Sequence, residues 1–237
     1  DLIDGDGGLR IAFISDIHAS SMDKAHLAYI VDEVNALEPD IVIIGGDTIE
    51  SSPDEFPILE PLKGLKPRIG SFAVLGNHDY GEWGCGSERT VSDLTEGRLE
   101  ELGISVLRNE HTLLSAGGRQ IALIGVDDEW SCMNDYLSAG AGLDDSIPKI
   151  VVAHNQESVD GGEIRGMSLV LSGHTHCGQF RVPIITPFLM KHIGGFGGAL
   201  GGRERLDDDT EAYVSCGITP GGIRFNAPPE ISVIEIV

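Results

Sequence analysis

The chain has 237 residues, 41% of them hydrophobic, and its 38 acidic and 16 basic side chains give a formal net charge of −22. This length suits one domain with a sizeable core, the charge disfavours binding to nucleic-acid duplexes, and no run approaches the ~20 apolar residues of a membrane span. The chain as given is therefore expected to be soluble. Because it begins at Asp1 rather than Met, removal of an upstream signal or anchor stays open, and with it export or membrane association.

The first third of the chain alternates apolar runs with helix-like segments. Residues 1–8 are acidic and glycine-rich and predict a loose lead-in. Three apolar runs predict buried strands, over residues 9–15, 41–44 and 69–75. Apolar side chains at helical spacing predict a helix over residues 23–37, and residues 51–65 predict a loop followed by a helix. This order is typical of an α/β fold with parallel strands.

The later elements are shorter. Helices are expected over residues 90–102 and 134–139, and a hairpin over residues 112–115 and 120–126. Further strands are expected over residues 104–107, 150–153, 168–171, 180–183, 212–215 and 231–237. Residues 187–202 set apolar side chains among six glycines and predict a mobile flap. The sequence is therefore interpreted as a single domain, residues 1–237, that carries this flap.

Side chains that can bind metal follow five of the predicted strands. They are Asp16, His18, Asp47, Asn77, His154, His174 and His176. In open α/β sheets, ligands bind at the carboxyl ends of the strands, so these side chains are expected at one edge. They are too many for one tetrahedral zinc ion and fit two ions that share a bridging carboxylate. Mixed nitrogen and oxygen donors suit manganese, iron, zinc or cobalt better than calcium or magnesium.

Five short motifs contain these residues in a fixed order. The motifs are Asp16-x-His18, Gly46-Asp47, Gly76-Asn77-His78-Asp79, His154 and Gly173-His174-Thr175-His176. Together they resemble the calcineurin-like metallophosphoesterases over nearly the whole chain. The resemblance implies a four-layer αββα sandwich with two facing mixed β-sheets, whereas the residues alone predict only a layered α/β sheet.

The resemblance also implies how two metal ions would divide the ligands. The first ion would be held by Asp16, His18 and His176. The second ion would be held by Asn77, His154 and His174. The carboxylate that bridges both ions would be that of Asp47.

Two further residues take catalytic roles by the same resemblance. A hydroxide that bridges the ions would attack phosphorus. His78 would stabilise charge on the phosphate or protonate the leaving oxygen as a general acid. Asp79 would hold His78 in its orientation and raise its basicity.

The end of the chain narrows the expected substrate. Residues 173–183 and 224–231 resemble a subgroup of single-domain members, some of which are UDP-2,3-diacylglucosamine pyrophosphatases. We therefore expect hydrolysis of a phosphodiester or pyrophosphate bond in a small molecule, with lipid-linked and nucleotide-linked substrates and peripheral membrane contact all open. Two alternatives also stay open: a phosphomonoesterase, including a phosphoprotein phosphatase, and a non-catalytic metal-binding scaffold.

Other residues receive structural interpretations. Asp127, Asp128 and Glu129 predict an acidic surface loop. The arginines after the last histidine pair either clamp a phosphate or form surface ion pairs, and ion pairs are favoured: Arg181, Arg203 and Arg205. Buried thiols, rather than a disulfide framework, are expected for the four widely spaced cysteines: Cys85, Cys132, Cys177 and Cys216.

Overall fold

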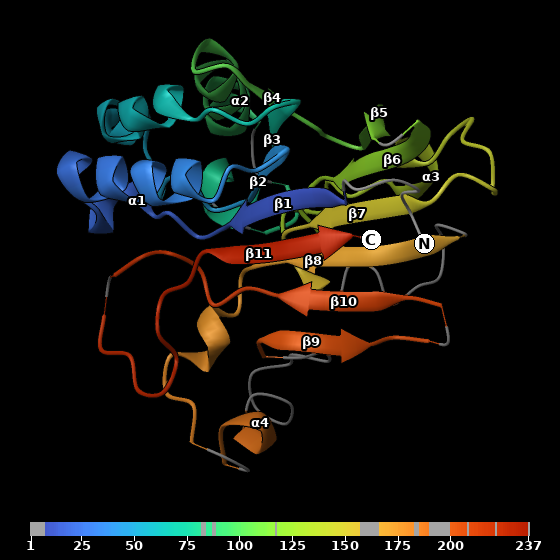
Figure 1. The fold of residues 1–237 in the computed structure, drawn as a ribbon. Coiled ribbons are helices and arrows are strands. Elements are labelled where there is room, and N and C mark those ends of the chain that lie inside the picture. Colours follow the sequence, from blue (N-terminus) through green and yellow to red (C-terminus); the bar gives the residue numbers. More distant parts are fainter. Residues whose placement is uncertain are drawn as a thin grey trace.

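Two β-sheets pack against each other in the computed structural model (Figure 1). The model describes residues 8–81, 84–86, 89–116, 118–156, 166–182, 185–189, 200–207, 209–220 and 222–236. The first sheet has the strand order β11-β1-β2-β3-β4. Its strands are Ser232–Ile236 (β11), Leu9–Ile14 (β1), Ile41–Gly45 (β2), Gly70–Val74 (β3) and Ile104–Val106 (β4). β1 to β4 are parallel, and β11 is antiparallel to β1.

The second sheet has the strand order β5-β6-β7-β8-β10-β9. Its strands are Glu110–Ala116 (β5), Arg119–Val126 (β6), Lys149–Ala153 (β7), Met167–Ser172 (β8), Glu211–Val214 (β10) and Gly202–Arg205 (β9). The four central strands are parallel, and β5 and β9 are antiparallel to their neighbours at the two edges. Both sheets are therefore mixed.

Apolar side chains fill the space between the sheets. Phe13 and Ile43 of the first sheet share one buried cluster with Leu123, Ile150 and Leu171 of the second. Because strands buried on both faces need apolar side chains on both faces, the apolar runs in the sequence identify them directly.

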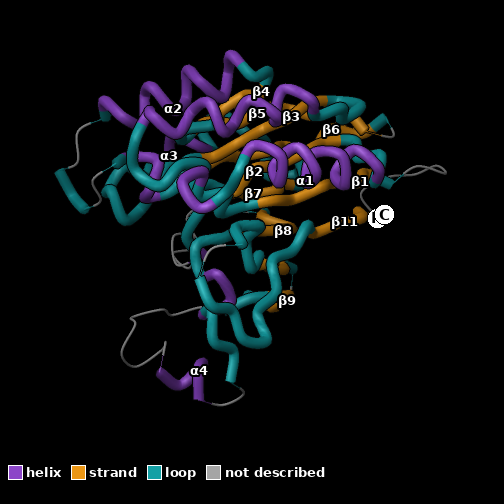
Figure 2. The backbone as a smooth tube through the Cα atoms, turned by 90° about the vertical axis from the view of Figure 1, so that its left-hand side faces the viewer, coloured by secondary structure: helices purple, strands orange, loops and turns teal. Residues whose placement is uncertain are grey.

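Helices cover the outer faces. α1 (Lys24–Ala36), α2 (Thr90–Glu101) and a 3₁₀ helix (Pro53–Gly64) pack on the outer face of the first sheet (Figure 2). α1 begins at Asp23, whose side chain accepts a hydrogen bond from the His26 backbone N–H at 2.7 Å. The short α3 (Tyr136–Ala139) packs on the outer face of the second sheet. The predicted four-layer arrangement is confirmed, with a thinner fourth layer.

Three local predictions differ from the structure. The segment predicted as a helix within residues 51–65 is 3₁₀ rather than α-helical, because Pro57 and Pro61 have no N–H to donate. The strand predicted over residues 180–183 is wrong, since the described part forms only an isolated bridge between Phe180 and Phe225. β9 was not predicted.

The predicted flap, residues 187–202, lies mostly outside the described residues. Its first residues end the short helix α4 (Ile185–Leu189), and its last residue, Gly202, begins β9. Residues 190–199 lie outside the described ranges, as do residues 1–7 of the predicted lead-in. Within the described ranges, no helix combines the length and apolar character needed to cross a bilayer.

The expectation of free thiols is wrong. Cys85 pairs with Cys132 and Cys177 pairs with Cys216, with Cα–Cα distances of 5.0 and 4.7 Å. The partners are 47 and 39 residues apart in the sequence, so only the folded chain brings them together.

The expected acidic surface loop is also wrong, because Asp127 and Asp128 are buried. Asp127 accepts hydrogen bonds from the Tyr80 hydroxyl at 2.8 Å and from Arg108 Nε at 3.1 Å. The pair directly continues the buried strand β6, so the chain turns within the core before it reaches the surface.

Candidate metal centre

The candidate ligands follow the carboxyl ends of parallel strands in both sheets. Asp16 and His18 follow β1, and Asp47 follows β2. Asn77 follows β3, His154 follows β7, and His174 and His176 follow β8. The fold therefore delivers the ligands to the same end of the sandwich from both sheets, as expected for parallel strands.

The backbone is strained at this end of the sheets. Positive φ angles, which side chains with a Cβ adopt rarely, occur at most of the candidate ligands: Asp16 (54°), His18 (45°), Asp47 (52°), His174 (68°) and His176 (48°). Such conformations cost of order 1–3 kcal/mol each and cluster at functional sites. The residues with these conformations include members of both groups of side chains that could bind metal.

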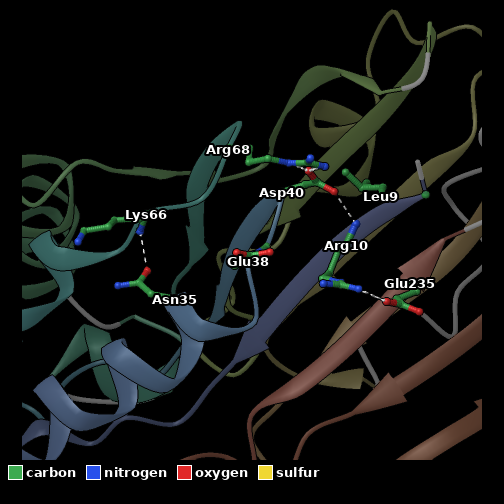
Figure 3. A pocket seen from close by; sticks show the side chains of 10 residues that line it. Leu9, Arg10, Asn35, Glu38, Asp40, Lys66, Arg68 and Glu235 are labelled. Atoms are coloured by element: carbon green, nitrogen blue, oxygen red, sulfur yellow. Dashed lines mark hydrogen bonds and ion pairs between the residues drawn. The ribbon is translucent and has the colours of Figure 1, made fainter. Parts of the chain in front are cut away.

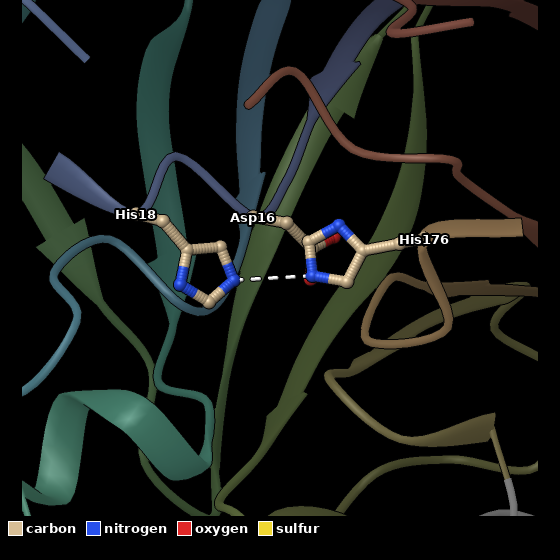
Figure 4. A group of neighbouring side chains, drawn as sticks. All are labelled: Asp16, His18 and His176. Carbon is tan, nitrogen blue, oxygen red and sulfur yellow. Dashed lines mark hydrogen bonds and ion pairs between the residues drawn. The ribbon is translucent and has the colours of Figure 1, made fainter. Parts of the chain in front are cut away.

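One group of side chains consists of Asp16, His18 and His176 (Figure 4). The Nε2 atoms of His18 and His176 lie 3.2 Å apart, and His176 Nε2 lies 3.6 Å from Asp16 Oδ1. The Ser15 hydroxyl donates to Asp16 Oδ2 at 2.5 Å, and the His174 backbone N–H donates to Asp16 Oδ1 at 3.0 Å. These two hydrogen bonds hold the Asp16 carboxylate in position.

A second group consists of Asp47, His154 and His174. Asp47 Oδ2 lies 3.1 Å from His154 Nε2 and 3.6 Å from His18 Nε2 of the first group. The Nδ1 atom of His154 lies 2.6 Å from the Gly45 carbonyl oxygen, so the other ring nitrogen points toward Asp47. Asp47 thus lies between the two groups.

Asn77 is the remaining candidate ligand. It is buried, and its Oδ1 atom has no hydrogen-bond partner among the described residues. It follows Gly76, where a Cβ would collide with Asp47 and His154. A buried amide oxygen without a partner is costly unless something else binds it.

The pKa values of these groups reflect how closely they are packed. Three histidines hold the pKa of Asp47 well below its usual range, although its burial acts in the opposite direction. Burial would lower the pKa of His154, but the Asp47 carboxylate outweighs it and raises the pKa to about 10. Burial and the neighbouring His154 lower the pKa of His174 to about 4. The buried Asp47 carboxylate therefore favours the protonated form of His154, whereas protonation of the neighbouring His174 is disfavoured.

Glu50 lies against two of the histidines and was not singled out by the sequence analysis. Its Oε2 atom lies 2.8 Å from His18 Nδ1, and its backbone oxygen lies 2.8 Å from His78 Nδ1. The rings of His18 and His78 meet edge to face, with centroids 4.8 Å apart. The sequence feature that could have identified Glu50 is its position, three residues after Asp47 in the loop that follows β2.

Asp79 is fully buried and has different partners. It accepts hydrogen bonds from the backbone N–H groups of Thr48 (2.9 Å), Ile49 (3.2 Å) and Gly76 (2.9 Å). Burial and the nearby Asp47 raise its pKa to about 6. Its carboxyl group thus ties the loop after β2 to the turn after β3.

Arginines near the site fall into two classes. Arg203 and Arg205 form ion pairs with Glu211, as the favoured interpretation expected. Arg181 contacts the Gly201 carbonyl oxygen at 3.4 Å. Arg224, in contrast, reaches the metal-ligand candidates, because its Nη2 atom lies 3.1 Å from His176 Nδ1.

The side chains that the fold gathers fit metal ions. Two carboxylates, four imidazoles and one amide oxygen provide the nitrogen and oxygen donors that first-row transition metals bind. His18 and His154 each have a protein oxygen at Nδ1, which leaves Nε2 facing the centre. The buried Asn77 oxygen also lacks the partner that a metal ion would supply.

Comparison with known proteins identifies the family. Residues 9–178 match the family described as calcineurin-like phosphoesterase. The chain belongs to this family.

Relatives match this chain over almost its whole length. It is 32% identical to a "Transmembrane protein with metallophosphoesterase domain" from Danio rerio, over 97% of this chain and 53% of that protein. It is 31% identical to "Phosphodiesterase YaeI" from Escherichia coli, over 96% of this chain and 82% of that protein. The chain thus spans about half the length of the first relative.

A solved structure shares the fold. The crystal structure of a dimetal phosphatase from Danio rerio aligns with a TM-score of 0.53 at 12% identity, covering 96% of each chain. At this identity the likeness concerns the arrangement of the sheets and helices, and it agrees with the two mixed sheets described above.

Proposed function

We propose that this chain is a binuclear metal-dependent phosphodiesterase that hydrolyses phosphodiester or pyrophosphate bonds of small molecules. The position of Asp47 carries the proposal, because its Oδ2 atom lies within 3.6 Å of an imidazole from each of two separate ligand groups. The Escherichia coli relative, which is named a phosphodiesterase, supports the choice of substrate class.

The seven candidate ligands divide into two sets in this proposal. Asp16, His18 and His176 would hold the first ion. Asn77, His154 and His174 would hold the second. Asp47 would be a ligand of both ions. Bound there, the ions would supply a water nucleophile that ionises near neutral pH and would polarise the phosphoryl oxygens.

His78 acts on the leaving group. Its Nδ1 atom lies 2.8 Å from the Glu50 carbonyl oxygen, an acceptor, so the proton at Nδ1 stays with that contact. The side chain is 20% exposed, so a substrate can reach the ring. His78 stabilises the phosphate or delivers a proton from Nε2 to the leaving oxygen, which is general-acid catalysis.

Glu50 and Asp79 position these groups. Glu50 orients His18 through its carboxylate and His78 through its carbonyl oxygen. The hydrogen bonds of Asp79 go to Thr48, Ile49 and Gly76, so we assign Asp79 to the loop that carries Asp47. We therefore propose Glu50, in place of Asp79, as the residue that orients the His78 ring.

The test combines metal analysis with hydrolysis of bis(p-nitrophenyl) phosphate by metal-stripped protein, with and without added manganese. We expect two bound ions per chain and manganese-dependent turnover. Asp47→Asn should bind fewer ions and lose about a thousandfold in turnover, because ions in such sites contribute several kcal/mol of transition-state stabilisation. Asp32→Asn, at an exposed position on α1, is the matched control.

The results that would contradict the shared carboxylate differ from those that would contradict the diesterase assignment. A single ion in the wild-type protein, or two ions and full turnover in Asp47→Asn, would rule out the shared carboxylate. Hydrolysis of p-nitrophenyl phosphate but not of the diester, by protein with two ions, would replace the diesterase assignment with a monoesterase.

A further inference from the structure

Large apolar side chains are exposed beside the metal centre. Their exposed fractions range from 50 to 76%, and we call this group the apolar lobe: Phe180, Ile185, Phe188, Ile223 and Phe225. Contiguous exposed apolar side chains of this size mark interaction sites more often than isolated ones do.

Backbone contacts join the two segments that form the apolar lobe. Phe180 and Phe225 form a parallel bridge, and the Arg181 N–H donates to the Phe225 oxygen at 2.8 Å. α4 is attached to the first segment, because the Thr186 N–H donates to the Val182 oxygen at 3.0 Å. In both views of the backbone, α4 lies at the end of the molecule away from α1 and α2 (Figures 1 and 2).

The apolar lobe adjoins the candidate metal ligands. The Gln179 N–H donates to the His176 oxygen at 3.0 Å, one residue before Phe180. Between the exposed Ile223 and Phe225, the side chain of Arg224 reaches inward to His176 Nδ1 at 3.1 Å. The same short segment therefore presents apolar side chains to the outside and a guanidinium group to the metal centre.

The charge around the apolar lobe differs from that of the chain. Although the net charge is −22, residues 164–203 are the longest run of the sequence without Asp or Glu, and residues 212–229 also lack them. Arg181 and Arg224 belong to these two segments. The two segments that carry the apolar lobe therefore contribute no negative charge that an anionic lipid surface would repel.

We propose that the apolar lobe docks onto the surface of a phospholipid bilayer and places the metal centre at the headgroup level. Exposed apolar side chains on segments that contain arginines and no acidic residues fit the boundary between headgroups and acyl chains. Docking does not depend on the proposed phosphodiesterase activity. If both hold, the substrates are phosphoesters that lie at or in a membrane.

The experiment measures co-sedimentation of the full chain with phosphatidylcholine–phosphatidylglycerol vesicles. Ile223→Asp places a charge at a position that is 76% exposed, where no packing is lost. Leu137→Asp is the matched control, because Leu137 is 75% exposed on α3, on the outer face of the second sheet. We expect wild type and Leu137→Asp to bind alike and Ile223→Asp to bind at least about tenfold more weakly.

Three results would overturn the proposal. If the wild-type protein stays in the supernatant, it does not bind the vesicles and the proposal is wrong. Equal binding by Ile223→Asp places the contact elsewhere. A wild-type dimer in light scattering that Ile223→Asp dissolves, without vesicle binding, makes the face an interface between two copies of this chain. Metal content and thermal unfolding of each variant identify misfolding, and Ile185→Asp provides a second position in the apolar lobe.

Discussion

Charged and polar side chains are arranged differently at the two ends of the first sheet. At the amino end of its strands, a pocket of about 630 Å³ is lined by charged side chains that pair with one another (Figure 3). Asp40 pairs with Arg68, and Arg10 pairs with Glu235 at 2.8 Å. At the carboxyl end, Asp16 and Asp47 face imidazole rings in place of arginines, and the Asn77 oxygen has no described partner.

This difference shows which kind of polar cluster indicates function. Charged side chains that pair with each other have no unmet interaction that a ligand would supply. The carboxyl end instead combines positive φ angles, a buried amide oxygen without a partner and closely packed imidazoles, all of which cost stability. Such losses of stability are tolerated where a bound ligand offsets them.

After Asp47→Asn, the largest effect on the metal centre should follow a change at Glu50. Glu50→Gln keeps an oxygen that accepts a hydrogen bond from His18 but removes the negative charge, so we expect about tenfold weaker metal binding or turnover. Glu60→Gln is the matched control, because the two side chains are equally exposed (44%) and Glu60 pairs only with Arg98 among the described residues. Metal titration and separate kcat and KM values are the measurements. Equal losses in both variants would contradict the positioning role.

An intermediate effect is expected for glycines. A Cβ at Gly173 would lie 2.6 Å from Asp16 Oδ2, so Gly173→Ala should lower the free energy of unfolding by about 2 kcal/mol and displace Asp16. Gly97 lies within α2 with open space around it, and Gly97→Ala should raise that free energy by about 0.5–1 kcal/mol. Urea denaturation of both variants tests the pair. Unchanged stability in Gly173→Ala would show that the loop relaxes freely.

The smallest effect is expected at the amino end. Asp40→Asn retains the shape of the side chain but removes its charge-assisted contact with Arg68, whose side chain is largely exposed. We therefore expect a loss of only about 1 kcal/mol in unfolding free energy and no change in turnover. Denaturation and steady-state kinetics on the same preparation test this. Loss of turnover would mean that the pocket at the amino end also has a function.

The sequence predicted the elements that depend on local pattern. The buried strands β1, β2, β3, β7 and β8 are continuous apolar runs, so they were located to within one or two residues. Short or irregular elements were harder to predict from the sequence. β9 is exposed along most of its length, and the segment after Gln179 makes one bridge rather than a strand. Such elements are decided by their neighbours in the fold.

The sequence by itself determined which donor atoms follow the parallel strands, because each polar residue comes directly after an apolar run. Only the tertiary structure decided which side chains meet across the two sheets. His174 contacts Asp16 at a separation of 158 residues, and the cysteine pairs join segments 39 and 47 residues apart. Glu50 and Arg224 gain their contacts with the histidines in the same way. Loop conformation and long-range packing fix these contacts, and neither leaves a periodic signal in the chain.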